Sequence, residues 1–169
     1  GGKGGMTDMG THVPLIAFWK DHTPQGQVND SLIDFTDFYP TLADAAGRAL
    51  AAEDPTDGVS FYPQLNGEEG SPRKWVFCHY EPYWNKTPGQ FVRNQRFKLY
   101  NDGRYFDVGS GDLEEKSSLA DSATGLAKST QQKLTKVMMA APPTPKGNGS
   151  RTTVNRPTYS DWLFLNPND

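Results

Sequence analysis

The sequence predicts an α/β fragment, the end of a larger mixed sheet, followed by a small α+β unit in which a helix packs on an antiparallel sheet. Two observations carry this prediction. A short apolar run at residues 13–19 precedes a helical pattern at residues 37–46, an order typical of α/β domains. Strand-like segments over residues 75–108 precede one amphipathic segment over residues 122–141, an order typical of α+β domains. The predicted boundaries are residues 1–70 for the fragment, 71–141 for the small unit and 142–169 for a tail.

The fragment is predicted to contain one buried strand and one helix. Residues 13–19 are apolar and bounded by turn residues, which is typical of a buried strand. Residues 37–46 predict a helix, because Thr36 or Asp37 can cap its start. Gly47 suits its end, where a left-handed residue often closes the last turn.

The small unit is predicted to begin with an antiparallel meander. Its strands are rich in aromatic and β-branched residues, and Asn-Asp-Gly between the last two is a hairpin signal. The four predicted strands are residues 75–80, 90–93, 97–100 and 104–108. The hairpin link, residues 101–103, joins the last two.

The amphipathic segment over residues 122–141 predicts a helix that ends at two prolines and lies on one face of the meander. Its apolar or small residues recur at helical spacing, at Leu126, Thr130, Leu134, Val137, Met138 and Ala141. The tail over residues 142–169 ends in an aromatic cluster, so we expect it to pack back onto the body.

The composition describes a folded chain with a small aliphatic core. Leucine, isoleucine, valine and phenylalanine make up about 18% of the 169 residues, under the roughly 20% below which highly charged chains stay disordered. The net charge is only −3 and aromatic residues make up 12%. Neither a membrane span, nor a signal peptide, nor a basic patch is evident, so we expect no membrane and no nucleic-acid partner. The single cysteine, Cys78, excludes an internal disulfide.

Lysine and histidine side chains are the first candidates for chemistry. Lys3 lies in a glycine-rich loop but is followed by Gly4, not by the Ser or Thr of a phosphate-binding loop. It is either a cation whose loop approaches an anion closely or a solvated lysine at a disordered terminus. No two of the three histidines, His12, His22 and His79, are spaced in sequence as the ligands of a local metal site are. Each is therefore either a structural or a catalytic residue.

The loop over residues 80–85 is the second candidate, because it places aromatic side chains next to a carboxylate. Tyr83 and Trp84 lie beside Glu81. Exposed aromatic rings suit stacking on sugars or aryl groups, but they also suit covering a sheet edge, and both interpretations stay open. Cys78, in the preceding strand, is most simply a small buried apolar side chain.

The order of these segments resembles that of sulfatases of the arylsulfatase type, in the alkaline-phosphatase-like superfamily. The match rests on a Gly-Lys-Gly segment, an Asp-x-x-Pro-Thr-Leu helix ending in Ala-Gly, an Asp-Gly-x-Ser…Pro-x-Leu-x-Gly loop, an Arg…Lys-Leu strand, and a final strand followed by Leu-x-x-x-x-x-Leu. These segments are residues 2–14, 37–47, 57–67, 92–99 and 104–120.

The resemblance implies roles for individual residues. Lys3 matches the family's active-site lysine, whose ammonium contacts the sulfate ester near its bridging oxygen. Asp8 and His12 stand where the family has Glu and Arg, so support of the loop and contact with substrate both remain open for them. His79 and Trp84 lie where family members reach over the mouth of the active site. The expected site is therefore Lys3 as the catalytic residue, with His12, His79 and Trp84 binding substrate and no metal ligand.

The resemblance also implies groups that this chain does not contain. In the family, the nucleophile is a formylglycine made from Cys or Ser in Cys/Ser-x-Pro-x-Arg, and Asp and Asn ligands bind calcium, all before the Gly-Lys-Gly segment. We therefore expect the C-terminal part of a sulfuric ester hydrolase, inactive alone. Its expected partners are a sulfate ester, such as a sulfated polysaccharide, and the remainder of its own polypeptide. Periplasmic or secreted localisation is favoured only by the family.

Two alternatives stay open. One is a phosphonate or phosphate monoester hydrolase of the same superfamily, and the other is a non-catalytic carbohydrate-binding module that uses Tyr83, Trp84 and Trp162. If the core is divided between this chain and a missing part, residues 1–50 should be the more exposed or less ordered part, while the meander and its helix hold together.

Overall fold

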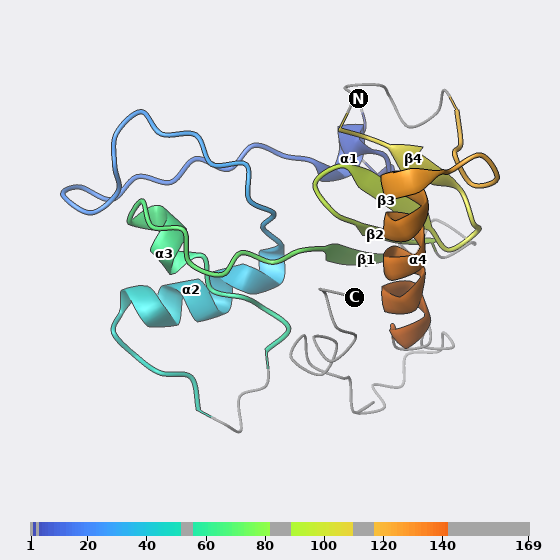
Figure 1. The fold of residues 1–169 in the computed structure, drawn as a ribbon. Coiled ribbons are helices and arrows are strands. Elements are labelled where there is room, and N and C mark those ends of the chain that lie inside the picture. Colours follow the sequence, from blue (N-terminus) through green and yellow to red (C-terminus); the bar gives the residue numbers. More distant parts are fainter. Residues whose placement is uncertain (1, 3, 52–55, 82–88, 110–116, 142–169) are drawn as a thin grey trace.

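A computed structural model describes residues 2, 4–51, 56–81, 89–109 and 117–141. Figure 1 shows the sheet with α1 and α4 on one side of the molecule and α2 with α3 on the other. The elements are α1 (Asp8–Thr11), the 3-10 helix η1 (Phe35–Asp37), α2 (Phe38–Ala45), α3 (Tyr62–Leu65), β1 (Val76–Tyr80), β2 (Gly89–Arg93), β3 (Phe97–Tyr100), β4 (Tyr105–Asp107) and α4 (Gly125–Ala140). The predicted tail, residues 142–169, lies outside the described residues.

The four strands form one antiparallel sheet in the order β1-β2-β3-β4, which confirms the meander. The link between β3 and β4 is the predicted hairpin. Tyr100 donates its backbone N–H to the Arg104 carbonyl at 2.8 Å, and Gly103 donates to the Tyr100 carbonyl at 3.0 Å. Gly103 has φ +89°, a backbone conformation that glycine adopts at low cost.

One face of the sheet packs against α4. Val92 and Tyr105 are fully buried and form a cluster with Leu134 and Val137 of the helix. The Tyr105 hydroxyl also donates to the Ala127 carbonyl at 2.8 Å, which fixes the helix to β4. The predicted helix and its position on the meander are therefore confirmed, although the observed helix is shorter than the predicted one at its start.

The opposite face of the sheet has a second apolar cluster. Phe91, Tyr100 and Phe106 are buried there, and Met6 of the N-terminal loop packs against them. Adjacent side chains in a strand point to opposite faces, so covering both faces explains why all four residues of β3 are buried. The sheet is thus sandwiched between α4 and the N-terminal loop.

The helix predicted at residues 37–46 is observed as α2, but its start is built differently. Asp34 caps η1, accepting a hydrogen bond from the Thr36 backbone N–H at 2.9 Å. Asp37, a predicted cap, stands at the N-cap of α2 without a side-chain capping bond to that helix. Its carboxylate instead accepts hydrogen bonds from the Asp34 backbone N–H, which belongs to the capping box of η1, and from two groups far away in sequence. Gly47 ends the helix with φ +65°, as predicted.

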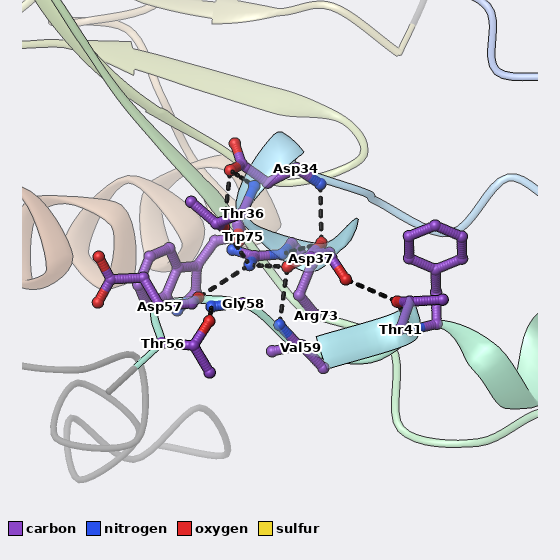
Figure 2. Close-up of polar contacts among 11 residues, drawn as sticks. Asp34, Thr36, Asp37, Thr41, Thr56, Asp57, Gly58, Val59, Arg73 and Trp75 are labelled. Carbon is purple, nitrogen blue, oxygen red and sulfur yellow. Dashed lines mark hydrogen bonds and ion pairs between the residues drawn. The ribbon is translucent and has the colours of Figure 1, made fainter. Parts of the chain in front are cut away.

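A buried ion pair joins Asp37 to Arg73 (Figure 2). Arg73 donates from Nε to Asp37 Oδ2 at 2.8 Å, and its Nη2 bonds to Oδ1. The same carboxylate accepts the Val59 backbone N–H at 2.7 Å, and Arg73 Nη2 donates to the Asp57 carbonyl at 3.2 Å. The two charged side chains are 4% and 2% exposed. This pair fastens the start of α2 to the loop over residues 57–59 and to the segment that enters β1.

The strand predicted at residues 13–19 is not formed, and this prediction was wrong for the chain by itself. The segment has no regular secondary structure, because a strand needs a neighbour and no described segment pairs with it. Ile16 is 91% exposed and Phe18 is 79% exposed. The expectation that the first part of the chain is more exposed is confirmed over this segment. The larger sheet expected around it lies beyond what the structure describes.

No helix among the described residues is long and apolar enough to cross a bilayer.

Candidate functional site

Two of the four predicted site residues, Lys3 and Trp84, lie outside the described residues. Their predicted roles therefore stay predictions. The residues on either side of Lys3 are described, and they belong to a glycine-rich turn in which Gly5 donates its backbone N–H to the Gly2 carbonyl at 2.8 Å. The residues that follow this turn contact the sheet directly.

The turn and α1 are packed so closely that one glycine of each, Gly2 and Gly10, admits no side chain. A Cβ atom at Gly2 would collide with the carbonyl group of Met9, and one at Gly10 would collide with the carbonyl oxygen of Gly5. The loop therefore doubles back on itself, and α1 follows directly from it. Gly2 and Gly5 are thereby held in close backbone contact with α1.

Lys98 anchors this loop to the sheet. Its side chain is 0% exposed, and its ammonium donates to the Met6 carbonyl at 2.6 Å and to Asp8 Oδ1 at 3.1 Å. The ammonium also lies 4.0 Å from the centroid of the Phe91 ring, an attractive arrangement for a cation. A buried ammonium requires such partners, since an unpaired charge away from water is strongly unfavourable.

Arg93 and Tyr100 complete the anchor. Arg93 donates from Nη1 to Asp8 Oδ2 at 2.8 Å, so each oxygen of the Asp8 carboxylate bonds to a different cation. The Tyr100 hydroxyl donates to the Met6 carbonyl at 3.2 Å. Among the two roles left open for Asp8, this geometry favours support of the loop. Lys98, Arg93, Tyr100, Asp8 and Met6 are called the loop anchor below.

His12 follows α1 directly. Its backbone N–H donates to the Asp8 carbonyl at 2.9 Å, and the residue is exposed. The ring therefore stands at the surface immediately after the loop anchor. Its predicted contact with substrate stays a prediction.

His79 lies in β1 and is half-buried between two polar side chains. Its Nδ1 is 3.2 Å from the Gln90 amide nitrogen on β2, and its Nε2 is 3.3 Å from a Glu81 carboxylate oxygen. With the amide nitrogen as donor, Nδ1 accepts and the ring proton lies on Nε2, where it donates to Glu81. The ring is thus oriented by both of its nitrogens. No hydrogen bond or ion pair joins His79 to His12 in the described part of the chain.

Cys78 is the thiol next to His79, on the opposite face of the strand. It packs partly buried against the second apolar cluster, as predicted for a small apolar side chain. Burial raises the pKa of the Cys78 thiol, the negative charge of Asp34 raises it further, and the positive charge of Lys98 opposes both. A thiol of raised pKa is a poor nucleophile at neutral pH.

In residues 2, 4–51, 56–81, 89–109 and 117–141, no group of three or more His, Cys, Asp or Glu side chains is arranged to hold a metal ion. The acidic residue of the loop anchor has its carboxylate bonded to two cations, which makes it unsuited to bind a third.

Comparison with known proteins identifies relatives over much of the chain. No protein-family model matches it. The chain is 36% identical over 97 residues, 51% of its length, to an uncharacterized sulfatase, YdeN, of Escherichia coli. It is 27% identical over 125 residues, 70% of its length, to an ulvan-active sulfatase of Formosa agariphila. The resemblance to sulfatases is confirmed. These matches span 17% and 24% of the two relatives' own lengths.

A solved 2-O GAG sulfatase is also similar. It is 33% identical, with 51% of this chain and 20% of that chain covered, at a TM-score of 0.41. The chain thus spans about a fifth of the length of these sulfatase relatives.

The loop anchor is the feature that sequence reasoning missed. The sulfatase-like motifs include Arg93 and Lys98, but the sequence alone assigned neither a role. One available signal was the strand Phe-Lys-Leu-Tyr, in which a lysine stands among large apolar residues. A charged residue in such a strand is either at an exposed edge or bonded to a buried partner, and here it is the second. The partner, 90 residues away in sequence, carried no comparable signal.

Proposed function

We propose that this chain is the C-terminal part of a sulfatase, a hydrolase that cleaves sulfate monoesters, and that it contributes Lys3 to the active site. The observation that carries the proposal is the identity to two sulfatases, which reaches 70% of the chain in one case. The loop anchor adds geometric support, because it bonds Met6 and Asp8, shortly after Lys3 in sequence, to the sheet.

The proposed role of Lys3 follows from the charge changes in the reaction. Cleaving the sulfur–oxygen bond of a sulfate monoester builds negative charge on the leaving oxygen. A fixed ammonium near that oxygen stabilises the charge as it develops and so lowers the barrier. This contribution requires a cation held in place before the reaction begins, since reorienting a mobile lysine would cost part of the gain. The loop anchor supports this role, because Lys98 bonds Met6 and Asp8, which follow Lys3 closely in sequence, to the sheet.

The nucleophile and the metal are assigned to the remainder of the polypeptide. A formylglycine hydrate would supply the attacking oxygen there, and calcium would be bound by acidic residues beside it. The residues described here do not fit either group. They offer no metal-binding cluster, and Cys78 lies in Val-Phe-Cys-His-Tyr rather than in Cys-x-Pro-x-Arg. This chain alone is therefore expected to be inactive.

A sulfated sugar is the proposed class of substrate. One relative, which matches 70% of this chain, is named for activity on ulvan. The arrangement of Glu81, His79 and Gln90 supports this class, because it presents oriented hydrogen-bonding groups at the surface of β1 and β2. We place His79 at the mouth of the site, together with Trp84 and His12, as residues that bind substrate.

The test uses the full-length protein with an aryl sulfate as substrate. Lys3→Ala should lower kcat/KM by about 10²–10³-fold, the usual effect of removing one group that stabilises developing charge. Lys20→Ala, which alters an exposed lysine nearby in sequence, is the matched control and should leave kcat/KM unchanged. An unchanged rate for Lys3→Ala would contradict the assignment. Aryl phosphate and phosphonate, assayed in parallel, distinguish a sulfatase from an enzyme specific for those esters.

A further inference from the structure

Tyr80, the last residue of β1, points to the face of the sheet that the N-terminal loop covers. Residues two apart in a strand share a face, and Cys78 packs with Met6 against the second apolar cluster. The Tyr80 hydroxyl lies 3.5 Å from the position that a Cβ atom on Gly4 would occupy. Gly4 follows Lys3 directly in sequence. The hydroxyl therefore lies beside the glycine-rich turn, next to the lysine that is proposed to act on substrate.

A second contact fixes the loop at the same end of the sheet. Gly89, the first residue of β2, is the register partner of Tyr80. A Cβ atom at Gly89 would collide with the sulfur of Met6, so the methionine side chain lies directly on this glycine. The Met6 carbonyl also accepts hydrogen bonds from Lys98 and Tyr100. The loop is thus held against the pair of strands at the position where Tyr80 stands.

The Tyr80 hydroxyl differs from those of two other tyrosines in the sheet. Tyr100 donates to the Met6 carbonyl at 3.2 Å, and Tyr105 donates to the Ala127 carbonyl at 2.8 Å. In the described part of the chain, the Tyr80 hydroxyl forms no hydrogen bond. The residue is half-buried, and its hydroxyl is not enclosed by the protein. A phenolic hydroxyl can both donate and accept, so folding leaves this donor available to a ligand.

We propose that Tyr80 contacts the substrate, and that its hydroxyl donates a hydrogen bond to a sulfate oxygen of the ester on which Lys3 acts. The inference rests on the proposed function, which places that lysine in the site. A hydrogen bond to an ionised group is roughly twice as strong as one between neutral groups. A donor that is in place before the substrate arrives also needs no reorganisation during the reaction. The hydroxyl keeps its proton throughout and stabilises the negative charge that the ester carries.

The kinetics of the full-length protein with an aryl sulfate test this role. Tyr80→Phe removes only the hydroxyl, so it should lower kcat/KM by about 10–100-fold, the usual effect of losing one hydrogen bond to a charged group, and leave the melting temperature unchanged. Tyr105→Phe is the matched control, because its hydroxyl is bonded to the Ala127 carbonyl. It should lower the melting temperature and leave kcat/KM unchanged. An unchanged kcat/KM for Tyr80→Phe overturns the inference.

Binding of inorganic sulfate to the full-length protein gives a second measurement that needs no turnover. The Kd for sulfate, measured by titration calorimetry, should rise about 10-fold in Tyr80→Phe and stay unchanged in Tyr105→Phe. An unchanged Kd in Tyr80→Phe overturns the assignment to a sulfate oxygen, whatever the kinetics show. A raised Kd in a protein that hydrolyses no aryl sulfate supports the assignment and contradicts the proposed function. Hydrolysis that depends on Lys3 but not on Tyr80 supports the proposed function and overturns the inference.

Discussion

Removing the guanidinium of Arg73 is the perturbation whose cost the structure defines best. Arg73→Met keeps much of the aliphatic stem but leaves the Asp37 carboxylate, 2% exposed, without its cation. The carboxylate retains the backbone N–H groups of Asp34 and Val59. The carbonyls of Asp57 and Trp75 lose a donor at the same time. Breaking a buried pair by removing one partner costs about 3–5 kcal/mol, a large part of the stability of an ordinary domain.

Urea unfolding of the isolated chain, followed by tryptophan fluorescence, measures this cost. Trp75 is a suitable reporter because it is 7% exposed and its carbonyl accepts a bond from Arg73. Arg96→Met is the matched control, since Arg96 pairs with Asp107 at a similar distance of 2.8 Å but with its side chain 58% exposed. Exposed pairs contribute little, so the control should shift the unfolding midpoint far less.

A double-mutant cycle separates the interaction energy of the two charges from the effect of changing the size of their side chains. Asp37→Asn alone leaves the Arg73 cation buried without its counter-charge, so it too should be strongly destabilising. Combining Asp37→Asn with Arg73→Met removes both charges, and the double variant should therefore be more stable than the sum of the single effects predicts. Strictly additive effects, or a loss below about 1 kcal/mol for Arg73→Met, would refute the argument that a buried charge is left unpaired.

Two further predictions concern the sheet. Lys98→Met removes the bonds to Met6 and Asp8, so it should lower the free energy of unfolding by about 3–5 kcal/mol and speed amide exchange over residues 5–11. Lys133→Met, at an exposed position of α4, is the control and should have neither effect. Burial, and then the charge of Asp107, raise the pKa of Tyr105 well above its ordinary value of 10.0, so the unfolded chain loses this proton first and stability should fall as the pH rises above about 10. Tyr105→Phe should lack that part of the decline in an alkaline series of melting temperatures, and an identical decline would contradict it.

The elements that the sequence predicts well are those whose partners are close in sequence. The meander, its Asn-Asp-Gly hairpin and α4 follow from period, turn residues and a proline stop, because each depends on residues within a few positions. The start of α2 shows the limit of this reasoning. A Thr or Asp before a helix predicts a cap, but Asp37 instead bonds to Arg73, 36 residues later. Capping preferences depend only on residues near the start of the helix, so they do not reveal a partner this far away in sequence.

The candidate site divides in the same way. Resemblance assigns a role to Lys3 from a short motif, yet the groups that hold the loop in place come from β2 and β3, 85 and 90 residues away from Asp8. A single sequence gives no measure of which distant charges meet. The apolar pattern at residues 13–19 predicts a strand, but a strand forms only beside a neighbouring strand. No described segment pairs with these residues, so the strand is absent from this chain although the pattern is typical of one.

The two faces of the sheet connect these observations. Because α4 covers one face and the N-terminal loop covers the other, the loop is part of the core of the small unit even though it lies at the opposite end of the sequence. The chain then leaves this core through residues 13–18, which find no partner, and returns through the Asp37–Arg73 pair. An ion pair with a buried cation therefore stands before this segment, at Asp8, and another stands well after it, at Asp37. The first pair bonds the N-terminal loop to the sheet, and the second bonds the start of α2 to the segment that enters β1.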